Sequence, residues 1–190
     1  GEDGTEYKTE SESYIRIISY KNQSHNGPEK FKIWMKDGTI WYYGFTEDSR
    51  VEPQGQSNVA YIWMVNRIED SNGNYIEFNY TENNTTGEFY INNIKYTGNS
   101  TQSLSPFYEI DFHTIERTDK DFAFVGDSKI SLNKILDEII IKNTSSSTII
   151  LKYKFQYLYE NHYTHLKGIT ISDKDENHYN PTKFNWDCNE

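Results

Sequence analysis

Residues 149–159 have the sequence IILKYKFQYLY, and this stretch decides the fold class. Aliphatic or aromatic side chains occupy every second position, from Ile149 to Tyr159, and Lys152, Lys154 and Gln156 lie between them. Successive side chains of a β-strand point to opposite faces of its sheet. The stretch therefore predicts a long strand with one apolar face and one polar face.

The same alternation appears in three further segments, residues 31–36, 76–80 and 108–112. Turn-forming sequences separate the strands, and Asp37-Gly38 is the clearest, because Asp-Gly favours the positive φ angles of a tight hairpin. Similar turns are expected at residues 70–74, 143–147 and 173–177. The sequence predicts an all-β fold in which antiparallel hairpins build a twisted, curved sheet or partial β-shell.

The strand pattern also predicts which side chains are buried. The inward face is expected to carry Ile76, Phe78, Tyr80, Leu151, Tyr153, Phe155 and Tyr157. The best helical signal, Ser131 to Glu138, is short and continues into a β-branched run, so a strand is favoured there. The charged segment from Glu116 to Lys129 is expected to be a loop or an insertion.

Composition excludes two classes of partner. The formal net charge is −10, and an acidic chain repels phosphate backbones, so no nucleic acid is expected to bind. No polybasic cluster and no apolar run of about 20 residues occurs, so no membrane insertion is expected. The abundant aromatic residues, 16 Tyr, 10 Phe and 4 Trp, suit a half-buried sheet.

Two segments are expected along the chain. Residues 1–13 are polar and acidic, which predicts a flexible N-terminus. Residues 14–190 are expected to form a single β-rich module. The chain begins with Gly1, and we expect it to be a fragment of a larger protein. Cys188 is the single cysteine, so no internal disulfide is expected.

Two turns have the alternating oxygen ligands of a calcium loop. They are Asp70-x-Asn72-x-Asn74 and Asp173-x-Asp175-x-Asn177. The first has Gly73 inside the triplet and no carboxylate at the twelfth position, and the second has Phe184 at its last ligand position. Hairpin turns are favoured for both, no metal site is assigned, and weak calcium binding at Asp173 and Asp175 stays open.

No catalytic or cofactor residue is assigned. His162 and His165 could share a metal only on a helix, and no third ligand can be named, so a surface pair is favoured. Ser131 and Lys134 match the Ser-x-x-Lys motif of acylating enzymes, but the sequence has no Lys-Thr-Gly partner. A hydrolase would require two facing carboxylates or a nucleophile beside a histidine.

Trp34, Trp41 and Trp63 are the candidate ligand-binding residues. Together with Trp186 they could form a platform for stacking sugar rings. Packing within the sheet is the simpler interpretation, since aromatic residues on strands mostly serve that purpose. Trp34 and Trp41 flank the Asp37-Gly38 turn, and cross-strand packing would explain them if they face each other.

Several blocks of the chain, in this order, resemble a known family. They are residues 31–39 with Tyr42-Tyr43-Gly44, residues 63–80, Ile94-Lys95-Tyr96-Thr97, residues 136–157 and residues 166–186. The order resembles the β-rich segment of bacterial Rhs/YD-repeat proteins, of the B component of insecticidal toxin complexes and of SpvB-type proteins. Turn glycines of that family are missing around residues 173–177, and tandem YD repeats are absent.

The resemblance implies a non-enzymatic structural or scaffold segment, without cofactors, of a large secreted or cell-surface bacterial protein. Its partners would be the flanking domains of its own parent chain, with protein cargo or a surface glycan as further candidates. The alternative is a carbohydrate-binding or adhesive surface β-module, which predicts aromatic side chains aligned on one exposed surface.

Overall fold

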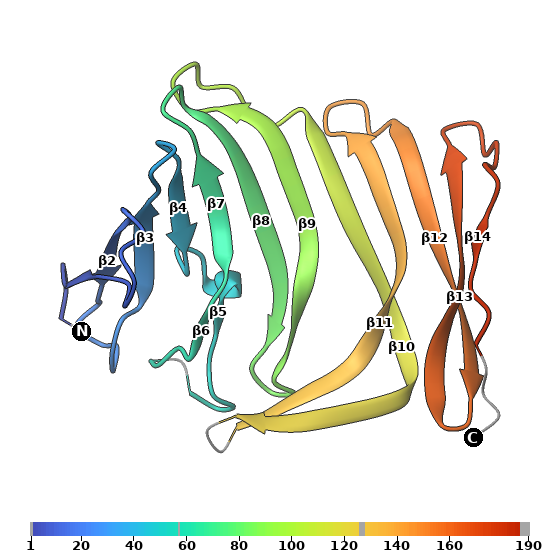
Figure 1. Ribbon diagram of the computed structural model, residues 1–190, viewed down its shortest axis with the longest axis horizontal. Coiled ribbons are helices and arrows are strands. Elements are labelled where there is room, and N and C mark those ends of the chain that lie inside the picture. Colours follow the sequence, from blue (N-terminus) through green and yellow to red (C-terminus); the bar gives the residue numbers. More distant parts are fainter. Residues whose placement is uncertain (1, 57, 126–127, 187–190) are drawn as a thin grey trace.

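The computed structural model describes residues 2–56, 58–125 and 128–186. Twelve strands form one antiparallel sheet in which spatial order follows chain order, and β5 and β6 form a separate pair between β4 and β7. Figure 1 shows the strands side by side from β2 at one end to β14 at the other. The sheet is not closed, and the predicted all-β class with antiparallel hairpins is confirmed.

The N-terminal half contains short strands and one helical turn. Its elements are β1 (Glu6–Tyr7), β2 (Arg16–Tyr20), β3 (Lys30–Trp34), β4 (Ile40–Tyr43), the 3₁₀ helix η1 (Glu47–Ser49), β5 (Arg50–Val51), β6 (Ile62–Trp63) and β7 (Val65–Glu69). β1 lies within the segment expected to be a flexible terminus and pairs with β2, where Glu6 lies opposite Ile18.

The C-terminal half contains long strands joined by tight turns. They are β8 (Asn74–Asn83), β9 (Glu88–Asn99), β10 (Tyr108–Val125), β11 (Ser128–Asn143), β12 (Ile149–Glu160), β13 (Tyr163–Asp173) and the short β14 (Thr182–Lys183). The favoured strand assignment at Ser131 to Glu138 is confirmed, because these residues lie in β11. No α-helix in the described ranges has the length and apolar character of a membrane span.

The loop expected from Glu116 to Lys129 is wrong. Residues 116–125 belong to β10 and residues 128–129 to β11, in the far half of the β10–β11 hairpin, where Phe122 lies opposite Ser131. Pairing shifts between Glu116 and Asp121, so β10 carries extra residues there. A bulge of this kind bends its strand and increases the local twist. The far half of the hairpin swings across the ends of β8 and β9 (Figure 1), and we call it the arm.

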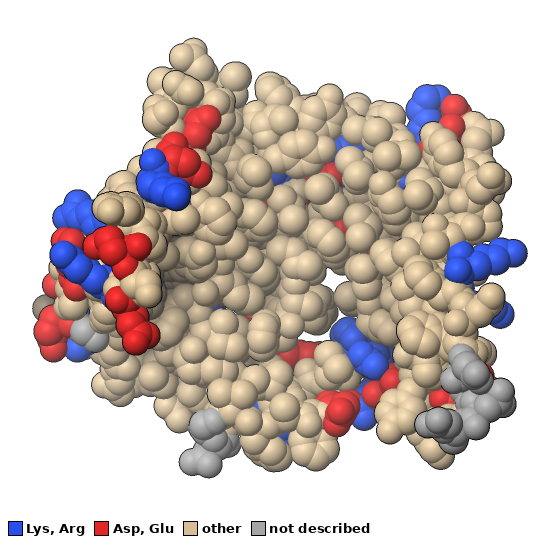
Figure 2. Space-filling model, in the orientation of Figure 1, with Lys and Arg blue, Asp and Glu red and all other residues tan. Residues whose placement is uncertain are grey.

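Cross-strand pairs define an apolar face of the sheet. Residues directly opposite each other on neighbouring strands point to the same face. One row of such pairs runs from β8 to β12 through Phe78, Ile94, Ile110, Ile141 and Leu151. A second row runs from β10 to β13 through Phe112, Ile139, Tyr153 and Ile171. Figure 2 shows few charged side chains over the middle of the sheet.

The opposite face carries a row of alternating charges. It runs across five neighbouring strands through Arg67, Glu77, Lys95, Glu109 and Lys142. Arg67 pairs with Glu77 at 3.1 Å, and Glu109 lies 3.9 Å from Lys95 and 3.7 Å from Lys142. Each of these ion pairs contributes little to the stability of the fold, but the network as a whole neutralises the charges on this face. This face therefore has polar groups that partner one another.

The apolar face is only half-buried. Of the hydrophobic residues that the structure describes, Val51 and Ala60 alone are buried. Ile76, expected to point inward, is 38% exposed, and the other six residues expected on the inward face are half-buried. The reason is that a single-layer sheet offers its apolar side chains only their neighbours in the same layer, whereas a core requires a second layer.

The exposed area is larger than that of a compact monomer. The chain exposes 11967 Å². A compact monomer of 22.4 kDa is expected to expose about 9,400 Å², which is about 2,500 Å² less. An excess of this size is comparable with the area that permanent interfaces bury, about 2,000–5,000 Å² in total.

Candidate functional site

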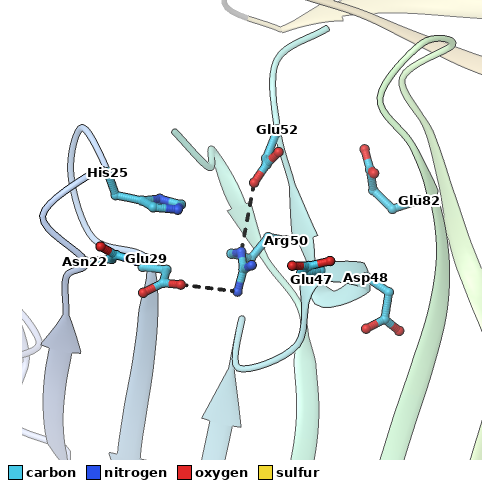
Figure 3. Close-up of a pocket in the computed structure, with 8 residues that line it drawn as sticks. All are labelled: Asn22, His25, Glu29, Glu47, Asp48, Arg50, Glu52 and Glu82. Atoms are coloured by element: carbon cyan, nitrogen blue, oxygen red, sulfur yellow. Dashed lines mark ion pairs between the residues drawn. The ribbon is translucent and has the colours of Figure 1, made fainter. Parts of the chain in front are cut away.

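A pocket of about 600 Å³ lies where the segment between β4 and β7 meets the loop after β2 and the end of β8. Figure 3 shows the side chains that line it, which are Asn22, His25, Glu29, Glu47, Asp48, Arg50, Glu52 and Glu82. Five of these carry carboxylates and Arg50 is the basic residue among them. We call this the acidic pocket.

Arg50 is the centre of the acidic pocket and is only 8% exposed. Its Nη1 donates a hydrogen bond to the carbonyl oxygen of Gly44 at 2.7 Å. Nη1 also lies 3.8 Å from Glu29, and Nε lies 3.9 Å from Glu52. A buried charge requires such partners: the two carboxylates offset the charge of the guanidinium, and the carbonyl oxygen accepts one hydrogen bond from it.

The 3₁₀ helix η1 positions two of the carboxylates. Thr46 precedes it and forms a capping box with Ser49, which fixes the first turn. Asp48 accepts a hydrogen bond from the backbone N–H of Tyr80 at 2.7 Å, and this bond ties η1 to β8. The same strand brings Glu82 to the pocket.

Burial and mutual repulsion raise two pKa values in the pocket. Burial raises the pKa of Glu52, against the lowering effect of Arg50. Burial also raises the pKa of Glu82, and the nearby charge of Glu52 adds to the effect. Groups with such shifts in a cleft are candidates for function. Within the described residues no group of three or more His, Cys, Asp or Glu side chains is arranged to hold a metal ion.

The three candidate tryptophans do not form one platform. Trp34 lies opposite Ile40 and Trp41 lies opposite Ile33, so the two indoles are on opposite faces of the β3–β4 hairpin. The condition for packing against each other across the hairpin is therefore not met. Trp63 packs edge-on against Phe31, on the same side as Trp41, with ring centroids 5.0 Å apart.

Each of these indoles has partners within the protein. The guanidinium of Arg16 lies 5.2 Å from the ring of Trp34, and Lys32 lies 4.9 Å from it. Trp41 donates a hydrogen bond to Thr39 at 3.0 Å, and Trp63 donates one to the carbonyl oxygen of Glu29 at 3.0 Å. The structure thus places all three in sheet packing.

The two calcium-like sequences form the same turn. Asp70 accepts hydrogen bonds from the backbone N–H groups of Asn72 and Asn74, at 2.9 and 2.8 Å, and from the Asn74 side chain at 2.8 Å. Asp173 accepts the equivalent three bonds from Asp175 and Asn177, each at 2.9 Å. These bonds lower the pKa of both aspartates, and in both cases the side-chain bond from the asparagine contributes most. Each aspartate carboxylate therefore accepts hydrogen bonds within its own turn.

The remaining motif residues also lie in ordinary structural positions. His162 lies in the β12–β13 turn with a φ of 70°, and the ring of His165 packs 5.2 Å from that of Trp186. Ser131 and Lys134 lie on a strand, and Lys134 pairs with Glu116. Cys188 lies outside the described residues.

Sequence reasoning did not find the acidic pocket. A local signal existed in residues 47–52, where four charged side chains are close together. His25, Glu29 and Glu82 join them only through the fold, because they come from before β3 and from the end of β8.

The fold and a sequence comparison together identify the family. The profile described as Salmonella virulence plasmid 65kDa B protein, SpvB, matches residues 5–123. The chain belongs to the SpvB family. The matched region of this SpvB-family chain includes the acidic pocket and the strands up to most of β10. No curated protein sequence gives a significant match.

Solved structures share the fold of this SpvB-family chain. The N-terminal domain of the effector protein SpvB from Salmonella typhimurium strain LT2 superposes with a TM-score of 0.76 at 14% identity, over 88% of this chain and 68% of that one. The Tc holotoxin pore of Photorhabdus luminescens gives 0.76 at 12% identity, and TcdB2-TccC3 gives 0.72 at 12% identity. These two superpositions include 92% and 89% of this chain, but only 11% of each toxin chain.

These matches confirm the resemblance to SpvB-type proteins and toxin-complex components. At such low identity the structural likeness shows the fold alone. The chain spans about two thirds of the SpvB domain and about a tenth of the toxin chains.

Proposed function

We propose that this chain is a non-enzymatic scaffold segment of a larger secreted bacterial protein, and that other parts of the same protein cover the apolar face of its sheet. The observation that carries the proposal is the single-layer sheet with its half-buried apolar face and its excess of exposed area. An apolar surface of that extent requires a covering layer to be stable in water.

The relatives support this reading of the surface. In the Tc structures a fold like this one is a small part of a much longer chain, which supplies candidate covering layers. A secreted location is part of the proposal, and the effector and toxin proteins that share this fold support it. Protein cargo is a further candidate occupant of the face, and the location at the cell surface stays a prediction.

The carbohydrate-binding alternative has less support. A sugar platform requires aromatic rings on one accessible surface, whereas Trp34 and Trp41 lie on opposite faces of their hairpin. Each of their rings also contacts neighbouring side chains of the sheet. The scaffold role explains these contacts without a ligand.

Hydroxyl-radical footprinting tests the proposal, because it labels aromatic side chains in proportion to their accessibility. The chain alone and the full parent protein are labelled under the same conditions. We expect Phe78, Phe112 and Tyr153 of the apolar face to be labelled in the chain alone and protected in the parent. Tyr75 is the internal control, since its ring lies against Arg67 on the charged face. Equal labelling of the apolar face in both proteins would refute the proposal.

A further inference from the structure

The acidic pocket has more negative charge than its own basic groups neutralise. Arg50 lies near Glu29 and Glu52. Among the described residues no basic group forms an ion pair with Glu47, Asp48 or Glu82. Carboxylates gathered in a cleft attract a cation, since the cleft focuses their field.

Three polar atoms in the pocket are buried without a hydrogen-bond partner. His25 is 8% exposed, and its Nδ1 has no hydrogen-bond partner. Its ring is directed into the pocket, toward Arg50 and Glu52 (Figure 3). Oε1 of Glu82 is also buried without a partner, on the other side of Arg50. The third atom is Nε of Arg50, a donor whose distance to Glu52, 3.9 Å, is too long for a hydrogen bond. Buried polar groups in folded proteins are almost always paired, so these three atoms indicate a missing ligand.

The size and the donor set define the class of ligand. A space of about 600 Å³ is typical of small-molecule sites and far larger than a single metal ion needs. The described residues also contain no cluster arranged as metal ligands. The carboxylates of the pocket accept hydrogen bonds and the Nε–H of Arg50 donates one, and the carboxylates outnumber the one guanidinium, so the ligand supplies N–H donors with positive charge beside an acceptor.

We propose that the acidic pocket binds an organic cation, a primary ammonium or guanidinium group, between Glu47, Glu82 and His25. Arg50 lies beside the site, with Glu29 and Glu52 near its guanidinium. The cationic group has two sources with the same chemistry. One is a free amine or guanidine, and the other is a Lys or Arg side chain that a protein segment inserts. Neither the scaffold role nor the apolar face enters this inference.

Isothermal titration calorimetry of the chain with four probes tests the site. Putrescine supplies ammonium groups, argininamide supplies a free guanidinium, and acetyl-Gly-Arg-Gly-amide supplies the same group within a peptide. Tetramethylammonium is the control, because it carries the charge without any N–H donor. We expect saturable binding of at least one of the first three and none of tetramethylammonium. Stronger binding of the peptide than of argininamide identifies a protein side chain as the occupant, and the reverse identifies a free small molecule.

Two variants locate the binding. Glu82→Gln keeps the shape of the side chain and removes its charge, and we expect it to weaken binding about tenfold or more. Glu160→Gln removes the same charge from the far end of β12, and we expect no change. The ring signals of His25 in NMR spectra should shift on binding in the unmodified chain. The proposal is overturned if tetramethylammonium binds as well as the N–H donors, if no probe saturates, or if Glu82→Gln binds normally.

Discussion

Gly44 lies so close to Trp63 that a Cβ atom at position 44 would come within 2.7 Å of the indole Cδ1. The same atom would be 3.0 Å from the carbonyl oxygen of Glu29. Gly44 also has a φ of 71°, a conformation that residues with a Cβ adopt at a cost. The approach to Glu29 joins the segment that carries Arg50 to the β2–β3 end of the sheet.

Gly44→Ala should lower the free energy of unfolding by about 3 kcal/mol, from backbone strain and overpacking together. Gly38→Ala is the matched control, because Gly38 has a φ of 87° with open space around it. Gly38→Ala should lower the free energy of unfolding by about 1 kcal/mol, because only the backbone strain opposes it. Urea unfolding of the three proteins measures both values, and equal costs would contradict the close packing at Gly44.

The recurring aspartate turn predicts a stabilising substitution. The fourth position of the turn has positive φ in both copies, 82° at Gly73 and 60° at Glu176. Glu176→Gly should therefore stabilise the protein by about 1 kcal/mol, because it relieves the strain at that position. Asp175→Gly places glycine at the neighbouring position, which has no positive φ, and should bring no gain. Thermal unfolding of the two variants distinguishes these outcomes.

The raised pKa of Glu82 predicts a pH-dependent effect. A carboxyl whose folded pKa lies above its ordinary value of 4.5 binds more protons in the folded state, so its contribution to stability falls as pH rises through that window. Glu82→Gln removes this effect. Its stability relative to the unmodified chain should rise from acid to neutral pH and then level off, as measured by urea unfolding at a series of pH values. A constant or falling difference would show that Glu82 is not destabilised by burial and by Glu52.

The arm is tied to β13 through Asp119. Its carboxylate accepts hydrogen bonds from the backbone N–H of Thr164 at 2.8 Å and from the Thr164 hydroxyl at 2.6 Å. Bonds from Arg117 and then from Thr164 lower the pKa of Asp119 well below its ordinary value. Thr164→Val removes the hydroxyl and should speed amide hydrogen exchange in residues 116–125.

Thr164→Ser keeps the hydroxyl and is the control for this substitution. It should leave the exchange of the arm close to that of the unmodified chain. If both variants exchange equally fast, the shape of the threonine, and not its hydrogen bond, holds the arm in place.

Local patterns predicted the strands but not every connection between them. The alternation in residues 149–159 gave β12 correctly, since strand periodicity is a property of neighbouring residues. The arm was missed because its charged residues resemble a loop, and the bulge after Glu116 interrupts the alternation. Trp34 and Trp41 lie on opposite faces because Trp34 pairs with Ile40. A shift of one residue in the pairing of β3 with β4 would place the two indoles on the same face, and the sequence pattern does not fix that register.

The acidic pocket could not be predicted for a different reason. Its residues come from three separate parts of the chain, and only the folded path of the segment between β4 and β7 brings Arg50 to Glu29 and Glu82. Charge in a sequence indicates a solvated surface, whereas burial of the same charge is a property of the tertiary structure.

The strands of the large sheet lie side by side in the order in which they occur in the chain. Each strand therefore pairs only with the strand before it and the strand after it in that sheet. Pulling on the two ends would load the hydrogen bonds of one strand pair at a time. The sheet should then give way by peeling inward from its edges, at low force for each step, instead of breaking in a single event. A protein built this way would lose its structure in many small steps.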